Sequence, residues 1–201
     1  MNRIVIVDYG LGNLRSVYRG LEKSGARPVI TFDTDEIAAA DAIVLPGVGA
    51  FRDGMDQIGE MQQVLTEAAA SVPMLGICLG MQMLLDWSEE HGLHAGLGII
   101  PGTVRRFDRS PGYKIPHMGW NSLESFMAGH PLMEGIREGA YVYFVHSYYA
   151  DTRAENTLTS TPYIRPFASA ITSGNVHGVQ FHPEKSGVTG LRILENFIGL
   201  I

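Results

Sequence analysis

The residue best suited to nucleophilic chemistry in this sequence is its single cysteine, Cys78. It lies between two apolar runs, and Gly76 and Gly80 flank it at two positions on either side. Small residues there leave room for a tight strand-to-helix turn, which is typical of a nucleophile elbow, here with sulfur in place of a hydroxyl. Unpaired N–H groups at the start of a helix favour a thiolate. A lone cysteine is more often a small buried hydrophobe, so other residues must decide between these interpretations.

A candidate base and its orienting group lie near the end of the chain. A cysteine nucleophile needs a base that takes its proton and a third group that orients the base. One residue, Pro183, separates His182 from Glu184. Pro183 favours extended backbone, in which the side chains of His182 and Glu184 project to the same face. The pattern predicts a triad of Cys78, His182 and Glu184.

Acyl transfer also needs hydrogen-bond donors for the oxyanion of the tetrahedral intermediate. The backbone N–H of Leu79, immediately after the nucleophile, is one candidate. The glycine-containing loop at residues 46–49, with Val48 and Gly49, can present another. Glycine and proline by themselves also explain this loop as an ordinary turn.

Other interpretations of the same residues are less favoured. A His-x-Glu pair is often a solvated pair at a strand end, and the proximity of His177 to His182 in sequence allows a metal site. A zinc deaminase would also need a Cys-x-x-Cys segment, which a single cysteine excludes. Gly10 and Gly12 resemble the start of a dinucleotide fingerprint, but Arg15 occupies the position of the third small residue. We therefore expect neither a metal nor a cofactor.

The composition excludes several classes of protein. A chain of 201 residues fits one domain, residues 1–201, with a sizeable core. One cysteine cannot form an internal disulfide, which suits the cytoplasm. The net charge of −6 argues against a nucleic-acid binder, and no apolar run is long enough to span a membrane. The densest basic spot, Arg105 and Arg106, is typical of the solvated side of a strand. The sequence still allows this spot to bind a small anionic ligand.

Strands and helices must position these residues, and in the first half of the chain the two kinds of element alternate. Short apolar runs predict strands at residues 4–7, 29–30, 42–45 and 74–77. Apolar residues at helical spacing predict helices at residues 14–21, 55–66 and 79–88. This rhythm predicts a parallel sheet, whose ligands bind at the carboxyl ends of the strands, where Gly10, Gly47 and Cys78 would lie.

The second half of the chain has a different pattern. Alternating runs predict strands at residues 103–107, 121–126, 141–145, 167–172 and 176–181, some of them antiparallel. A final helix is expected at residues 191–198. The expected fold is a three-layer α/β domain with a mostly parallel central sheet, flanking helices, and antiparallel strands in the C-terminal half.

In combination, these segments resemble a known family. Gly-Ile-Cys-Leu-Gly-Met-Gln at residues 76–82, His-Pro-Glu at 182–184 and Pro-Gly-Val-Gly at 46–49 are similar to the triad-type, or class I, glutamine amidotransferases, and the resemblance spans nearly the whole chain. Within that family, residues 8–13, 46–51, 117–121 and 143–148 resemble the glutaminase subunits of imidazole glycerol phosphate synthase. Glutaminases of pyridoxal-phosphate synthase are similar in size, but carry a Gly-Gly-Glu-Ser type loop instead of residues 47–49.

The resemblance implies a reaction and a substrate. Cys78 would attack the side-chain carboxamide of glutamine, His182 would protonate the departing ammonia, and Glu184 would orient His182. Residues at the family's positions for binding glutamine are Gly47, Gly49, Gln82, Glu90, His146, Ser147 and Tyr148. A carboxylate at Glu90 suits the substrate ammonium, although an exposed acid explains it almost as well.

The resemblance also implies a protein partner. The family passes ammonia through a dry channel into a (β/α)₈ cyclase subunit of histidine biosynthesis, so a heterodimer is expected. The residues at the family's docking positions are Asn13, Trp120, Tyr143 and Lys185. Trp120 and Tyr143 are also ordinary core candidates. A stand-alone cysteine hydrolase, a glutaminase of another ammonia-channelling synthase and a non-catalytic binding subunit stay open as alternatives.

Overall fold

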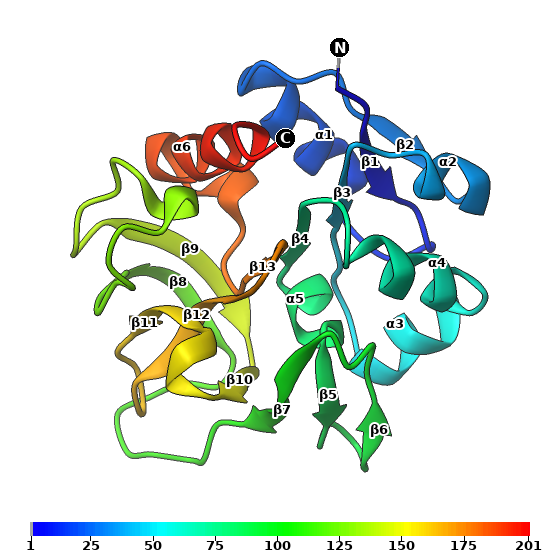
Figure 1. Ribbon diagram of the computed structural model, residues 1–201. Coiled ribbons are helices and arrows are strands. Elements are labelled where there is room, and N and C mark those ends of the chain that lie inside the picture. The colour runs from blue at the N-terminus through cyan, green and yellow to red at the C-terminus, as the bar shows by residue number, and fades with distance from the viewer. Residues whose placement is uncertain (1) are drawn as a thin grey trace.

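The computed structural model describes residues 2–201, in which two β-sheets are present (Figure 1). The parallel part of the 11-stranded sheet comprises, in spatial order, β2 (Val29–Thr31), β1 (Ile4–Val7), β3 (Ala42–Leu45), β4 (Met74–Ile77) and β13 (Val176–Val179). The sheet continues, mainly antiparallel, through β12 (Phe167–Ser173), β10 (Tyr148–Thr152), β7 (Ile100–Arg106), β5 (Leu85–Ser88) and β6 (His94–Ala95), and β11 (Thr157–Thr161) pairs with β12. The second sheet pairs β8 (His117–Ser122) with β9 (Tyr141–His146).

Side-chain alternation along the strands explains the layers. In β1, Ile4 and Ile6 belong to one hydrophobic core and Val5 and Val7 to another, and all four are buried. Since neighbouring side chains point to opposite faces, both faces of the sheet need a cover. One is covered by α1 (Leu14–Lys23) and α6 (Gly187–Ile198), the other by α2 (Thr34–Ala38), α3 (Phe51–Ile58), α4 (Met61–Ala68) and α5 (Leu79–Met83). This confirms the predicted three-layer α/β fold.

The predicted strands of the parallel sheet are confirmed. The bounds of β1, β3 and β4 are those expected from the apolar runs, and β2 is one residue longer. Since β3 pairs with both β1 and β4 in parallel, the loops after these three strands emerge at one edge. Gly10, Gly47 and Cys78 follow those strands and therefore meet at that edge, as predicted.

Other predicted elements need correction. The expected helix at residues 55–66 is two helices, α3 and α4, separated at Gly59, whose φ of +46° does not fit a right-handed helix. The expected helix at 79–88 ends at Met83 because residues 85–88 form β5, which pairs with β7. The strand expected at 121–126 lies instead at 117–122, as β8.

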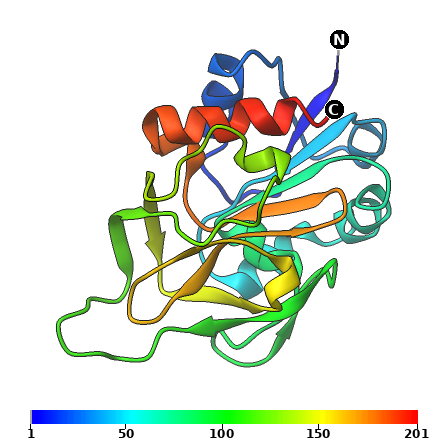
Figure 2. The ribbon, with the colours of Figure 1, turned by 60° about the vertical axis from the view of Figure 1, so that its left-hand side comes forward.

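Several short elements escaped prediction altogether. They are α2, β6, β10, β11 and three 3₁₀ turns, η1 (Pro131–Met133), η2 (Ala154–Asn156) and η3 (Pro183–Lys185). Figure 2 shows the second half of the chain packed beside the parallel sheet, with α6 running across α1. None of the helices within residues 2–201 is long and apolar enough to cross a membrane.

Candidate active site

Cys78 lies in a strained turn between β4 and α5, as the flanking glycines predicted. Its φ of +54° and ψ of −106° are rare for a residue with a side chain and cost about 1–3 kcal/mol. A Cβ atom at Gly76 would lie 2.7 Å from the backbone nitrogen of Met81, and one at Gly80 would overlap the carbonyl oxygen of Leu45. Both glycines are therefore needed for the nucleophile elbow, which leaves Cys78 8% exposed.

His182 and Glu184 form a buried pair beside the cysteine. His182 Nδ1 lies 2.9 Å from Glu184 Oε1, and the two side chains are 3% and 1% exposed. The predicted contact is present, but its predicted backbone geometry is wrong. Only His182 is extended, and Glu184 belongs to the 3₁₀ turn η3, which brings the carboxylate back under the ring.

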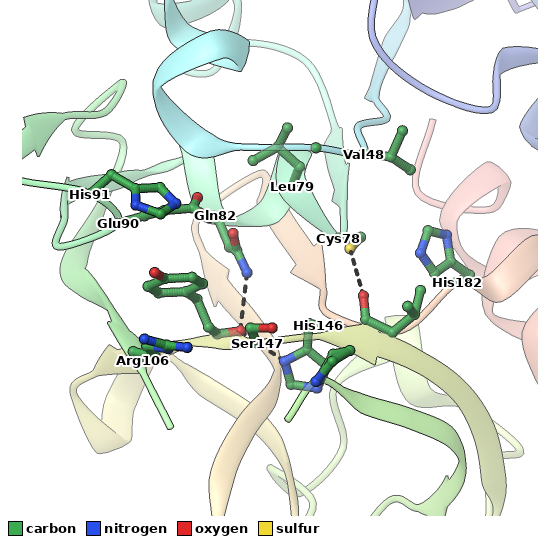
Figure 3. A pocket seen from close by; sticks show the side chains of 14 residues that line it. Val48, Cys78, Leu79, Gln82, Glu90, His91, Arg106, His146, Ser147 and His182 are labelled. Atoms are coloured by element: carbon green, nitrogen blue, oxygen red, sulfur yellow. Dashed lines mark hydrogen bonds between the residues drawn. The ribbon is translucent and has the colours of Figure 1, made fainter. Parts of the chain in front are cut away.

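The surroundings of His182 favour its protonated form. Burial by itself lowers the pKa of His182, but the interactions with Cys78 and Glu184 outweigh it and raise the pKa to about 9. Its Nε2 is buried without a hydrogen-bond partner among residues 2–201, and the ring lies beside Cys78 (Figure 3). The ring can therefore supply a proton close to the sulfur at neutral pH.

Two residues that the sequence analysis missed hold the His182 segment in place. Ser186 Oγ donates a 2.6 Å hydrogen bond to the carbonyl oxygen of His182 and accepts one of 3.0 Å from the N–H of Tyr143. Gly190 lets α6 approach closely, because a Cβ there would overlap the carbonyl oxygen of Pro183. The helix expected at residues 191–198 begins four residues earlier, at Gly187, so Gly190 lies inside it, and a glycine within a helix often has such a packing reason.

Gln180 was also missed, although it contacts Cys78. Its side chain is fully buried, and Nε2 donates to the Cys78 sulfur at 3.6 Å. Gln82 Nε2 donates to Gln180 Oε1 at 3.0 Å and to the carbonyl oxygen of Tyr148 at 3.2 Å. Both amide hydrogens of Gln82 are thus used within the protein, and its Oε1 is left to accept from a ligand. Gln180 precedes His182 by two positions, a spacing that could have drawn attention to it.

The two candidate oxyanion elements contact each other. The N–H of Leu79 donates to the carbonyl oxygen of Gly47 at 3.4 Å, so this donor is occupied in the structure. Val48 is 40% exposed, and Gly49 has a φ of +107°, which a residue with a side chain rarely adopts. The glycines on either side of Val48 therefore allow the backbone of this loop more conformations than other residues would.

Most of the predicted site residues meet in one cavity of about 470 Å³, the size of a small-molecule site. The predicted residues that line it are Val48, Gly49, Cys78, Leu79, Gln82, Glu90, His146, Ser147, Tyr148 and His182. Glu184 and Gly47 do not line the cavity, but each contacts a residue that does, namely His182 and Leu79. Lining residues that were not predicted are His91, Arg106, Pro116 and Val145. The carbonyl oxygen of Val145 lies 4.0 Å from the sulfur.

Glu90 is held in a fixed orientation at the cavity wall. Its Oε2 accepts a 2.7 Å hydrogen bond from the N–H of Phe51, the first residue of α3. The backbone N–H of Glu90 in turn donates to Ser88 Oγ at 3.1 Å. One carboxylate oxygen therefore caps the helix, and the other is left for a positively charged ligand group.

His146 uses both ring nitrogens within the protein. Nδ1 lies 2.8 Å from the carbonyl oxygen of Tyr148 and must donate to it, so Nε2 accepts from His117 Nδ1 at 2.9 Å. His117 Nε2 then accepts from Asn121 at 3.3 Å. This chain of donors requires both rings to be neutral. Accordingly, burial lowers the pKa of His146 to about 3 and that of His117 to about 4.

We expect the buried neutral histidines to make the protein sensitive to acid. Burial also lowers the pKa of His177 to about 4, so below the ordinary value near 6.5 the unfolded chain binds protons that the folded chain does not. Above pH 6.5 these three residues therefore cost no free energy of unfolding, and below it each of His117, His146 and His177 lowers that free energy by about 1.4 kcal/mol per pH unit. Urea unfolding at pH 5 and pH 7 measures this. The pH slope should decrease in His177→Gln but not in His91→Gln, at an exposed position; equal slopes would contradict the assignment.

The residues at the expected docking positions lie at or near the surface. Asn13 and Lys185 are exposed, and Trp120 is 54% exposed, so it is not a core residue. Trp120 packs edge-on against the half-buried Tyr143 of the neighbouring strand, with ring centroids 6.2 Å apart. The carbonyl oxygen of Tyr143 accepts a 2.9 Å hydrogen bond from the N–H of His182. This aromatic pair, of which Trp120 is exposed, is therefore connected to His182 by one hydrogen bond.

Histidines 177 and 182 do not form a joint site. His177 Nδ1 lies 2.8 Å from Thr172 Oγ1, whereas His182 pairs with Glu184. Within residues 2–201, no group of three or more His, Cys, Asp or Glu side chains is arranged to hold a metal ion.

Comparison with known proteins agrees with this geometry. Residues 5–200 match the family model described as glutamine amidotransferase class-I. The chain is 56% identical over 201 residues to the imidazole glycerol phosphate synthase subunit HisH of Methanosarcina acetivorans, with 98% of each chain covered. It is 46% identical to the subunit of the same name from Archaeoglobus fulgidus, again with 98% of each covered.

Solved structures with lower identity share the fold. The structure of PurLQS from Thermotoga maritima matches with a TM-score of 0.77 at 20% identity, covering 99% of both chains. The glutaminase domain of Trypanosoma brucei CTPS matches with a TM-score of 0.71 at 18% identity, covering 100% of this chain and 93% of that one. From the full-length family match and its HisH relatives, the chain belongs to the class I glutamine amidotransferase family, within the group of imidazole glycerol phosphate synthase subunits.

Proposed function

We propose that Cys78, His182 and Glu184 hydrolyse L-glutamine to L-glutamate and ammonia, and that the ammonia passes to a cyclase subunit. The observation that carries this proposal is the buried His182–Glu184 pair, 2.9 Å apart, beside a cysteine held in a strained elbow. The cavity in front of them has the size of a small-molecule site.

The chemistry follows from the positions of these groups. The Cys78 thiolate attacks the carboxamide carbon of glutamine, and the carbonyl oxygen becomes an oxyanion. His182 gives its proton to the nitrogen, the C–N bond breaks, and ammonia leaves a glutamyl thioester on the sulfur. His182 then takes a proton from water, whose oxygen attacks the thioester and releases glutamate and the thiolate. Glu184 keeps Nδ1 occupied, so that Nε2 performs both proton transfers.

In this proposal, the donors for the oxyanion become available only after a change in the backbone of the loop at residues 46–49. The N–H of Leu79 is bound to the carbonyl oxygen of Gly47, which therefore competes with an oxyanion for that donor. A rotation of the peptide between Gly47 and Val48 would release the Leu79 N–H and turn the N–H of Val48 towards the substrate. Structures with and without the partner's substrate test this, since an unchanged peptide orientation would contradict it.

The cyclase partner, a (β/α)₈ subunit, is proposed to dock on the face that contains Asn13, Trp120, Tyr143 and Lys185. Exposed aromatic residues are favoured at the centres of protein interfaces. The hydrogen bond from the N–H of His182 to the carbonyl oxygen of Tyr143 directly connects this face to the triad. The resulting heterodimer would form imidazole glycerol phosphate and an aminoimidazole carboxamide ribonucleotide in histidine biosynthesis.

A glutamate-release assay tests the proposed function. Glutamate is measured with the chain alone, with the cyclase subunit, and with the cyclase plus its ribonucleotide substrate. We expect weak release by the chain alone and strong stimulation in the third mixture. No stimulation by the cyclase would contradict the proposed partner, and stimulation by the synthase subunit of another ammonia-using enzyme would support the alternative glutaminase role.

A further inference from the structure

One side of the active-site cavity carries two opposite charges that the triad does not use. Among the described residues that line the cavity, Glu90 is the one carboxylate and Arg106 the one arginine or lysine. In Figure 3, Glu90 lies beside His91 and Arg106 lies below them, both on the side of the cavity opposite Cys78 and His182. Two opposite charges at the far end of a small cavity match the ammonium and carboxylate of a free amino acid.

The strand register explains why Arg106 faces the cavity. Arg106 of β7 lies directly opposite Tyr148 of β10 in the antiparallel ladder. Residues in such a pair have their side chains on the same face of the sheet. Since Tyr148 lines the cavity, Arg106 lines it too, and its neighbour Arg105 points to the opposite face.

The two arginines differ in their partners. Arg105 forms ion pairs with Glu89 at 3.2 Å and Asp151 at 2.8 Å. The guanidinium of Arg106 forms none with the residues of the described range, 2–201. Its donors are free for a ligand, and the planar fork of a guanidinium matches the two oxygens of a carboxylate.

We propose that Arg106 binds the α-carboxylate of glutamine and so determines substrate specificity. This inference rests on the proposed function, which places the carboxamide at Cys78, and it takes the ammonium to lie at the free carboxylate oxygen of Glu90. The carboxylate is chemically unchanged throughout the reaction, so the contact is equally strong in the ground state and the transition state. Arg106 therefore affects KM, whereas kcat stays nearly constant.

Steady-state kinetics of the complex with the cyclase and its ribonucleotide substrate test the role of Arg106. In Arg106→Ala, we expect the KM for glutamine to rise about tenfold or more, the cost of losing a charge-assisted hydrogen bond, with kcat within about twofold. Arg106→Lys should recover part of the loss because it keeps the charge but not the fork. Arg105→Ala is the matched control, from the same strand and with the same charge, and should leave both constants unchanged.

A second measurement isolates the carboxylate without requiring turnover. The labelling rate of Cys78 is measured with a chloroketone analogue of glutamine and with its α-methyl ester, which lacks the negative charge. Wild type should prefer the free acid about tenfold or more, and Arg106→Ala should lose that preference while it labels with the ester at the wild-type rate. An equal loss for both reagents, or an unchanged preference, would overturn the inference.

The two measurements separate failure of this inference from failure of the proposed function. If wild type neither releases glutamate in the complex nor labels at Cys78, the glutaminase proposal fails. If wild type does both and Arg106→Ala behaves like Arg105→Ala, only the assignment of the carboxylate site fails.

Discussion

Cys78→Ala is expected to abolish glutamine hydrolysis, with a loss of at least about 10⁴-fold in kcat, because no other group can form the thioester. Cys78 lies at the carboxyl end of β4, beside the ring of His182, and within residues 2–201 it is the one cysteine. Glutamate release in the presence of the cyclase and its ribonucleotide substrate measures the loss.

Controls for this variant address folding and assembly. Alanine keeps the Cβ of Cys78, so the strained elbow between β4 and α5 is preserved, and only the sulfur contacts with Gln180 and Val145 are lost. We therefore expect an unchanged circular dichroism spectrum and unchanged binding to the cyclase. Activity within about 100-fold of wild type would contradict a covalent mechanism, since removing a nucleophile costs far more than this.

Glu184→Gln is expected to have the second largest effect, a loss of about 10²- to 10⁴-fold in kcat/KM, because Glu184 fixes the orientation and tautomer of His182. Glu184 is also one of the groups that raise the pKa of His182 to about 9. Removal of its charge lowers the pKa of His182, so the ring loses its proton at a lower pH. The protonated ring is the form that releases ammonia. The alkaline limb of the kcat/KM profile should lie near pH 9 in wild type and move to lower pH in the variant.

The sign of the pH shift distinguishes this role from a purely structural one. A variant that only loosened the turn η3 would lose activity at every pH and keep the position of the alkaline limb. Glu22→Gln, at an exposed position of α1, is the matched control and should change neither the rate nor the profile. A shift of the limb to higher pH in Glu184→Gln would contradict the assignment.

Local sequence signals predicted the parallel sheet and the elbow because both depend on near neighbours. Buried apolar runs bounded by glycine, proline or polar residues defined β1, β3 and β4 with their observed bounds. The prediction failed where pairing with another strand determines whether a segment forms a helix or a strand. Residues 85–88 have an apolar pattern that also fits a helix, and they form β5 because β7 offers its backbone groups beside them.

The sequence by itself determined the chemical groups of this protein, namely a cysteine between two close-packing glycines, a histidine with a carboxylate two positions later, and a glycine loop after the neighbouring strand. The tertiary structure decided which polar groups surround the sulfur. Gln180 reaches Cys78 across 102 positions of the chain, and Arg106 faces the cavity because β7 pairs with β10 in one register. Buried polar groups must find partners wherever the fold supplies them, and sequence spacing does not encode those non-local partners.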